Sequence, residues 1–176
     1  MGIETAARRP ARMSLANLAT GESIEAQFNP SGLEESLEVN WTRQVVPGLS
    51  HQPLQFVHTG NDKFNLELLF EALEATGLDD LLLARRFLQS LCYPRRGAQD
   101  VIGGAPPRVL FVWPTIASLT TVITSLAFKY ERFNVAGTPT RFTVKVSLEE
   151  IRDVRLFADD VLRSGTRRSG AGGGSR

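Results

Sequence analysis

The chain has 176 residues, a formal net charge of +1 and one cysteine, Cys92. One domain is expected at this length, which suffices to bury a core without cross-links, and an intrachain disulfide is excluded. No apolar run approaches the roughly 20 residues that span a bilayer, and no apolar core follows the arginines near the N-terminus. We therefore expect neither membrane insertion nor a secretory signal.

The near-neutral total conceals basic ends on an acidic body. Residues 1–12 carry three arginines and one glutamate, and residues 163–176 carry four arginines and no acid, so the body between them has a net charge of −5. Such ends could be solvated tails, dock on an acidic neighbouring copy, or bind nucleic acid. No aromatic residue is interleaved with the arginines of 163–176, so a base-stacking platform is missing and we expect no nucleic-acid partner.

Alternation of apolar and polar residues dominates the first half of the chain and predicts β-strands. Strands are expected over 13–18 and 22–28, joined by a turn at Thr20-Gly21. Two further strands are expected over 37–41 and 63–70. The residues predicted to face a packed core are Ile24, Ala26, Phe28, Leu37, Val39, Trp41, Phe64, Leu66, Leu68 and Phe70.

One segment has helical rather than strand periodicity. Apolar residues recur at spacings of three and four from Leu78 to Cys92, with Asp79 and Asp80 in the first turn and Pro94 after the end. This pattern predicts a helix that packs on the sheet.

The second half of the chain returns to strands. Val109 to Trp113 is apolar throughout, which predicts a strand covered on both faces. A long strand over 121–133 turns at Ala136-Gly137 and returns over 141–151 as a hairpin. Its inward face is expected to be Phe142, Val144, Val146 and Leu148, and its wet face Arg141, Thr143, Lys145 and Ser147.

Two less regular segments are candidates for contacts between subunits. The Gly-rich loop 94–107 contains Arg95, Arg96, Gly103 and Gly104, and long loops of this kind tend to be functional. Residues 153–162 could form a short helix or an extended arm laid over a neighbour, with the apolar residues Val154, Phe157, Val161 and Leu162 as its anchor. The tail beyond them has a disordered composition.

A search for catalytic chemistry finds little. His51 and His58 have no paired cysteine and make a poor metal set. Cys92 has no nearby histidine and is predicted to be a buried structural thiol. Glu149 and Glu150 are adjacent on a strand and therefore point to opposite faces. We expect no enzyme activity and no catalytic, metal or cofactor site. The strand aromatics, Trp41 and Phe56 among them, are predicted to be core.

The order of several motifs resembles the tube-like proteins of contractile injection systems, over roughly residues 13–151. The motifs are Phe28-Asn29-Pro30, Leu37 to Trp41, Pro47-Gly48-Leu49, Pro53-Leu54-Gln55-Phe56, Phe64 to Phe70, Pro107 to Trp113, Val122 to Leu126, Gly137-Thr138-Pro139 and Val144 to Glu150. The resemblance implies a mainly β fold with one or two helices (α+β): a tail-tube-like antiparallel β-sandwich or barrel flanked by a helix. The expected organisation is a basic N-terminal arm (1–12), a tube-like β domain (13–151), and a C-terminal arm and Gly/Ser/Arg-rich tail (152–176).

The resemblance also implies a structural function. The chain is expected to form a homo-oligomeric, six-fold ring in the baseplate that joins the inner tube to the spike hub, with sheath or other baseplate proteins as neighbours. In such a ring Arg141, Thr143, Lys145 and Ser147 would face the channel. Assembly is expected in the cytoplasm as part of a phage-tail-like particle that is either released or retained. The family member concerned often carries a peptidoglycan-binding LysM domain, for which this chain has no room, so peptidoglycan binding is not carried over.

Alternatives remain open at this point. Within the same machine, the chain could be the main inner tube subunit or a peptidoglycan-associated baseplate protein. A small-ligand-binding β-barrel would require a cavity, against which the many large core residues argue. A peptidoglycan hydrolase would require a catalytic set that the sequence does not offer.

Overall fold

The structure is a computed structural model that describes residues 11–72, 77–94, 104–114 and 116–152. The described residues form nine strands and one helix. In chain order these are β1 (Ser14–Asn17), β2 (Ser23–Glu25), β3 (Leu33–Ser36), β4 (Val39–Arg43), β5 (Leu54–Thr59), β6 (Lys63–Glu71), α1 (Gly77–Ser90), β7 (Val109–Trp113), β8 (Ala117–Phe133) and β9 (Pro139–Glu150).

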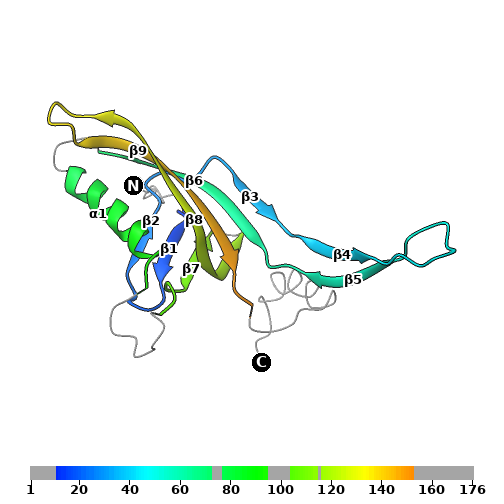
Figure 1. The fold of residues 1–176 in the computed structure, drawn as a ribbon. Helices are drawn as coiled ribbons and strands as arrows, with labels where there is room; N and C mark the ends of the chain where they lie inside the picture. The colour runs from blue at the N-terminus through cyan, green and yellow to red at the C-terminus, as the bar shows by residue number, and fades with distance from the viewer. Residues whose placement is uncertain (1–10, 73–76, 95–103, 115, 153–176) are drawn as a thin grey trace, which may run out of the picture.

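Seven strands form one antiparallel sheet in the order β2-β1-β7-β8-β9-β6-β3, and β4 pairs with β5 in a separate two-stranded ladder (Figure 1). The predicted mainly β, α+β class is therefore confirmed. The sheet begins at β2 and ends at β3, so it is an open sheet rather than a closed barrel. The predicted hairpin of the long strands is present, and its turn holds Gly137 at a φ of 78°, a conformation that glycine adopts without steric cost.

The hydrophobic core lies between the sheet and α1. All of the predicted inward residues of β6 and β9 are buried, and they meet Leu15 of β1 and Phe111 of β7. Alternate residues of these strands point to opposite faces, which is why the period of two in the sequence located this core correctly. In β7, Val109 and Phe111 are buried, while Leu110, Val112 and Trp113 are half-buried. The predicted full cover of both faces is therefore only partial.

Helix α1 is fixed to the sheet through Leu81, Leu88 and one arginine. The Nε of Arg85 donates a hydrogen bond to the Tyr130 hydroxyl at 2.6 Å. Its guanidinium carbon lies 5.9 Å from the ring centroids of both Phe128 and Tyr130. Because cations are attracted to the faces of aromatic rings, this side chain ties the helix to β8.

Removing this arginine is expected to loosen the helix. Arg85→Ala should lower the free energy of unfolding by about 1–2 kcal/mol, since both a hydrogen bond and a cation–π contact are lost. Arg85→Lys should recover part of this because it keeps the charge and much of the stem but not the planar fork. Urea unfolding of the two variants gives the comparison, and equal stability of Arg85→Ala and the parent protein would contradict it.

The last described residues are held by a compact ion cluster. Arg152 Nη2 lies 2.6 Å from Glu150 Oε2 and also contacts Asp62. Burial alone would lower the pKa of the Arg152 guanidinium. Hydrogen bonds and charge attraction from Glu150 and Asp62 outweigh that effect, so the pKa is raised above its ordinary value. The cluster joins the end of β9 to the start of β6.

Arg152→Ala is expected to cost about 1–3 kcal/mol of stability, because it leaves two largely buried carboxylates without their cation. The double change Arg152→Ala, Glu150→Gln should recover part of that loss, because one of the two stranded charges is removed as well. Thermal or urea unfolding measures both. A double variant less stable than the single one would show that the cluster matters through packing instead.

Four expectations need correction. The residues at 37–41 do not pack on a core, and Trp41 and Phe56 are about half exposed, because β4 and β5 leave the sheet as a separate ladder. The second strand ends at Glu25, so Phe28 lies outside it and is exposed. The long strand begins at Ala117 rather than Thr121. A strand over 33–36, β3, was not predicted. The candidate helix over 153–162 lies outside the described residues.

Candidate functional site

The most unusual surface is a projecting ladder that we call the arm, residues 37–60. It runs outward from β3 and β6 away from α1 (Figure 1). Gly60 N–H donates to Glu38 C=O at 2.8 Å at its base, and Trp41 meets Phe56 edge to face with ring centroids 5.5 Å apart. At its far end a Pro47-Gly48 turn holds Gly48 at a φ of 90°.

The arm is apolar but covered by nothing in the described structure. Its nine exposed large hydrophobic residues are Leu37, Val39, Trp41, Val45, Val46, Leu49, Leu54, Phe56 and Val57. A two-stranded ladder is marginally stable alone in water, and contiguous exposed apolar surface marks an interaction site. These exposed apolar residues therefore mark the arm as a candidate interaction surface.

The second surface is the open edge of β8, the side of residues 122–133 that faces away from β9. Strand β7 pairs with β8 only between Ala117 and Thr121, so no described strand covers the rest. The edge contains no proline. A long unpaired edge of this kind is a template for another strand.

The hydrogen-bonding parity of β9 shows which groups of β8 face that edge. Ile151 N–H donates to Thr120 C=O at 2.9 Å, whereas Ala72 N–H donates to Thr140 C=O at 2.8 Å. The backbone N–H and C=O of one strand residue point to the same side. The backbone groups of odd-numbered β9 residues therefore hydrogen-bond with β8, and those of even-numbered residues hydrogen-bond with β6. Within the open edge, the β8 residues that lie opposite even-numbered β9 residues have backbone groups that point outward. They are Ile123, Leu126, Phe128 and Tyr130.

The opposite side of the sheet is also incompletely paired. Strand β3 covers β6 only between Lys63 and Leu66. Beyond that, the Gln27 side chain takes the place of a strand at the far end of β6: its Nε2 donates to Glu71 C=O and its Oε1 accepts from Glu71 N–H, both at 2.8 Å. The sheet therefore offers one unpaired stretch near each of its long margins.

Between the two margins lies the face that does not pack on the core, and the predicted channel-facing residues all lie on it. Arg141 Nε is 3.0 Å from Glu131 Oε2, and Ser147 Oγ is 2.7 Å from Asn65 Oδ1. Thr143 is buried and its hydroxyl donates to Glu131, whereas Lys145 is exposed. Acidic and basic groups alternate on this face, so it is polar without a strong single-sign charge.

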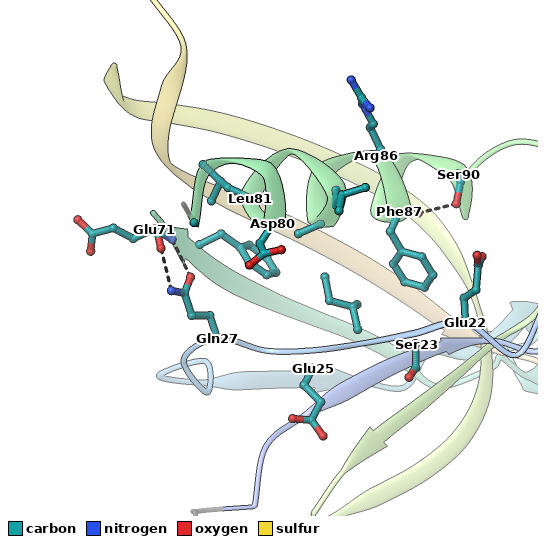
Figure 2. Close-up of a pocket in the computed structure, with 15 residues that line it drawn as sticks. Glu22, Ser23, Glu25, Gln27, Glu71, Asp80, Leu81, Arg86, Phe87 and Ser90 are labelled. Atoms are coloured by element: carbon teal, nitrogen blue, oxygen red, sulfur yellow. Dashed lines mark hydrogen bonds between the residues drawn. The ribbon is translucent and has the colours of Figure 1, made fainter. Parts of the chain in front are cut away.

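A third surface is a groove between α1 and β2, with a volume of about 950 Å³ (Figure 2). Its apolar lining comes from Ile24, Phe70, Leu81, Ala84 and Phe87. In Figure 2 Phe87 points from the helix toward β2, Asp80 points to the groove, and Arg86 points away from it.

The other predicted contact residues are only partly visible. Gly104 is half-buried and precedes β7 in the sequence. Arg95, Arg96, Gly103, Val154, Phe157, Val161 and Leu162 lie outside the described residues, so the roles of the loop and the C-terminal anchor stay predictions.

The described residues include both histidines and the cysteine of the chain. No group of three or more His, Cys, Asp or Glu side chains among them could hold a metal ion. His51 lies in an exposed bend, and His58 contacts Asn40 on the arm. Cys92 is half-buried at the end of α1, and burial raises the pKa of its thiol, which disfavours the reactive thiolate. Among the described helices, none has the length and apolarity needed to cross a membrane.

The family model of the contractile injection system tube protein matches residues 11–157. The chain belongs to this family. It is thus a structural component of a phage-tail-like contractile injection machine, and the resemblance seen in the order of its motifs is confirmed at this level. No curated protein sequence matches the chain.

Among solved structures, a chain of the anti-feeding prophage (AFP) baseplate, a six-fold symmetrised cryo-EM structure, is similar to this one. The match has 13% sequence identity and a TM-score of 0.33, and it covers 86% of this chain and 95% of that chain. A likeness of this strength bears on neither fold nor placement in the machine.

Sequence reasoning missed the arm as a surface. The signal was present in the turn itself, where Val45, Val46 and Leu49 surround Pro47-Gly48. Turns at hairpin ends are usually polar, so an apolar turn points to burial against a partner.

Proposed function

We propose that this tube-family chain forms a six-fold baseplate ring that joins the inner tube to the spike hub. The observation that carries the ring is the pair of open margins: the open edge of β8 on one side of the sheet and the partly covered β6 on the other. Joining such margins between copies satisfies the outward backbone groups of these two stretches, and closing the ring leaves neither margin unpaired.

In such a ring the polar face of the sheet would line the channel. With the core and α1 on one side of the sheet, the other side becomes the wall of the ring. Its outward groups include Lys145 and the hydrogen-bonded pair of Ser147 and Asn65, which suit a wet channel. A wall of balanced charge lets cargo pass without binding it strongly.

The adaptor role and the role of main tube subunit predict different assemblies. A tube subunit stacks on its own rings and grows into long tubes, whereas an adaptor stops at one ring because its two ends meet different partners. Negative-stain electron microscopy of the purified chain, alone and with the inner tube and hub proteins, separates the two. We expect single rings alone and incorporation at the tube end in the mixture.

If the chain alone formed long tubes, its role would be that of the main tube subunit and not that of the adaptor. A protein that stays monomeric at high concentration and joins neither partner would overturn the ring itself. A peptidoglycan-associated role would require pull-down on purified cell-wall sacculi, which we expect to be negative.

A further inference from the structure

We propose that the groove between α1 and β2 receives the arm of a neighbouring copy, a strand-type contact additional to the pairing of sheet margins. The inference rests on the proposed function, because it requires that copies of the chain assemble. It assigns an occupant to the groove and a partner to the arm, which are the two apolar surfaces that the subunit leaves open.

The groove is suited to an apolar guest with a basic group. Ile24, Phe70 and Phe87 are among its apolar lining residues, and its volume of about 950 Å³ lies within the range of ligand-binding clefts. Acidic side chains stand around it: Glu22 and Asp80 line it from opposite sides, and Arg86, the basic residue of its lining, points away (Figure 2).

The backbone of β2 favours a strand as the guest. Glu22 C=O accepts from Asn17 N–H, and Ala26 N–H donates to Met13 C=O, both at 2.8 Å. These even-numbered residues therefore face β1, and by the same parity the backbone groups of Ser23 and Glu25 face outward. Strand β2 is the terminal strand of its sheet, so an extended segment can add to it by edge pairing.

The arm has the matching chemistry. It is extended and its side chains are largely apolar. Its charged side chains at neutral pH are Glu38 at the base, which pairs with Lys63, and Arg43 farther out, and it carries no carboxylate beyond Glu38. An apolar strand with one cation complements a groove with an apolar floor and carboxylates at its margin.

The guest must come from another copy. The arm continues from β3 and β6 at one end of the body. Helix α1 and the groove lie toward the opposite end (Figure 1). The arm of a subunit therefore points away from its own groove. A head-to-tail contact of this kind links copies in one direction and closes when the rotation between them closes a ring.

Cysteine cross-linking between two differently tagged copies tests the contact. In a Cys92→Ser background, one copy carries Gln44→Cys on the arm and the other carries Asp80→Cys in the groove. We expect a disulfide-linked heterodimer after mild oxidation of the mixed assembly. The matched control replaces Asp80→Cys by Arg86→Cys, on the same helix but pointing away from the groove, and it should cross-link at background level.

A charge exchange gives an independent readout. Arg43→Glu should weaken association about fivefold, and adding Asp80→Arg should restore it, because an exposed ion pair contributes about 1 kcal/mol at most. Asp79→Arg is the control, since Asp79 lies in the same helical turn as Asp80 but outside the groove, and it should not restore association.

The outcomes separate this inference from the proposed function. Rings that form without the Asp80 cross-link, or with equal cross-linking at Arg86, overturn the arm-in-groove contact and leave the ring standing. Cross-linked copies that never close into rings support the contact and count against the ring. If neither cross-link nor association is seen at any concentration, both fail.

Discussion

Replacing Leu126 by proline is expected to abolish ring formation, while replacing it by alanine should leave rings intact. The backbone N–H of Leu126 points to the open edge of β8, because its β9 partner, Val146, is an even-numbered residue that bonds β6. Proline has no N–H and tolerates only edge positions of sheets, so it removes the donor that a neighbouring strand would need. Association should fall at least tenfold, or about 1.4 kcal/mol per contact.

Alanine is the matched control because both changes remove the same half-buried side chain. Each should cost the subunit similar stability in urea unfolding, and the difference in assembly then reports the edge alone. Ser125→Pro is expected to have the opposite effect. The N–H of Ser125 points to β9 inside the sheet, so its loss should unfold the subunit and not only prevent assembly. Sedimentation velocity of the three variants makes the comparison, and rings formed by folded Leu126→Pro would exclude pairing at this edge.

The core could be read from the sequence because its strands keep a strict period of two. Phe64 to Phe70 and Phe142 to Leu148 alternate cleanly, and all of these apolar residues are buried. One face of each strand packs on the core, so hydrophobicity alone fixes which residues point inward. The helix could also be predicted from the sequence, since Asp79 and Asp80 mark its start and Pro94 marks its end.

The arm shows where this reasoning stops. Leu37, Val39 and Trp41 follow the same period of two as the core strands, yet they are exposed. Alternation reports that one face of a strand is apolar, but it does not say whether the covering surface belongs to the same chain. In an assembling protein the two cases are indistinguishable until the coordinates show which strands leave the body.

The groove and the open edge depend on contacts between distant segments, which no local pattern encodes. Gln27 bonds Glu71 across 44 residues, and the open edge of β8 exists only because β7 is shorter than β8. A sequence contains the lengths of both strands but not their register. Of the residues predicted for the wet face of β9, Arg141, Lys145 and Ser147 are exposed or half-buried. The prediction was wrong for Thr143, which is buried and whose hydroxyl donates to Glu131, a contact that required the neighbouring strand to be placed.

Trp41→Ala is expected to weaken ring assembly about 30-fold or more while changing subunit stability little. Trp41 is 55% exposed in the isolated subunit, so most of its apolar surface is left for a partner to cover. Buried tryptophans at the centre of interfaces commonly contribute 2 kcal/mol or more to binding. Within the subunit its main loss is the edge-to-face contact with Phe56, about 1 kcal/mol.

Phe142→Ala supplies the opposite signature and so controls for general damage. Phe142 is fully buried against Phe70, Phe128 and Tyr130, and its truncation should cost about 3–5 kcal/mol of folding free energy. Urea unfolding and sedimentation velocity, measured on both variants, should place Trp41→Ala as a stable subunit that does not assemble and Phe142→Ala as an unstable one. Because about half of the Trp41 side chain is left exposed by the described residues, a Trp41→Ala protein that assembles at parental concentration would mean that the arm does not take part in the ring.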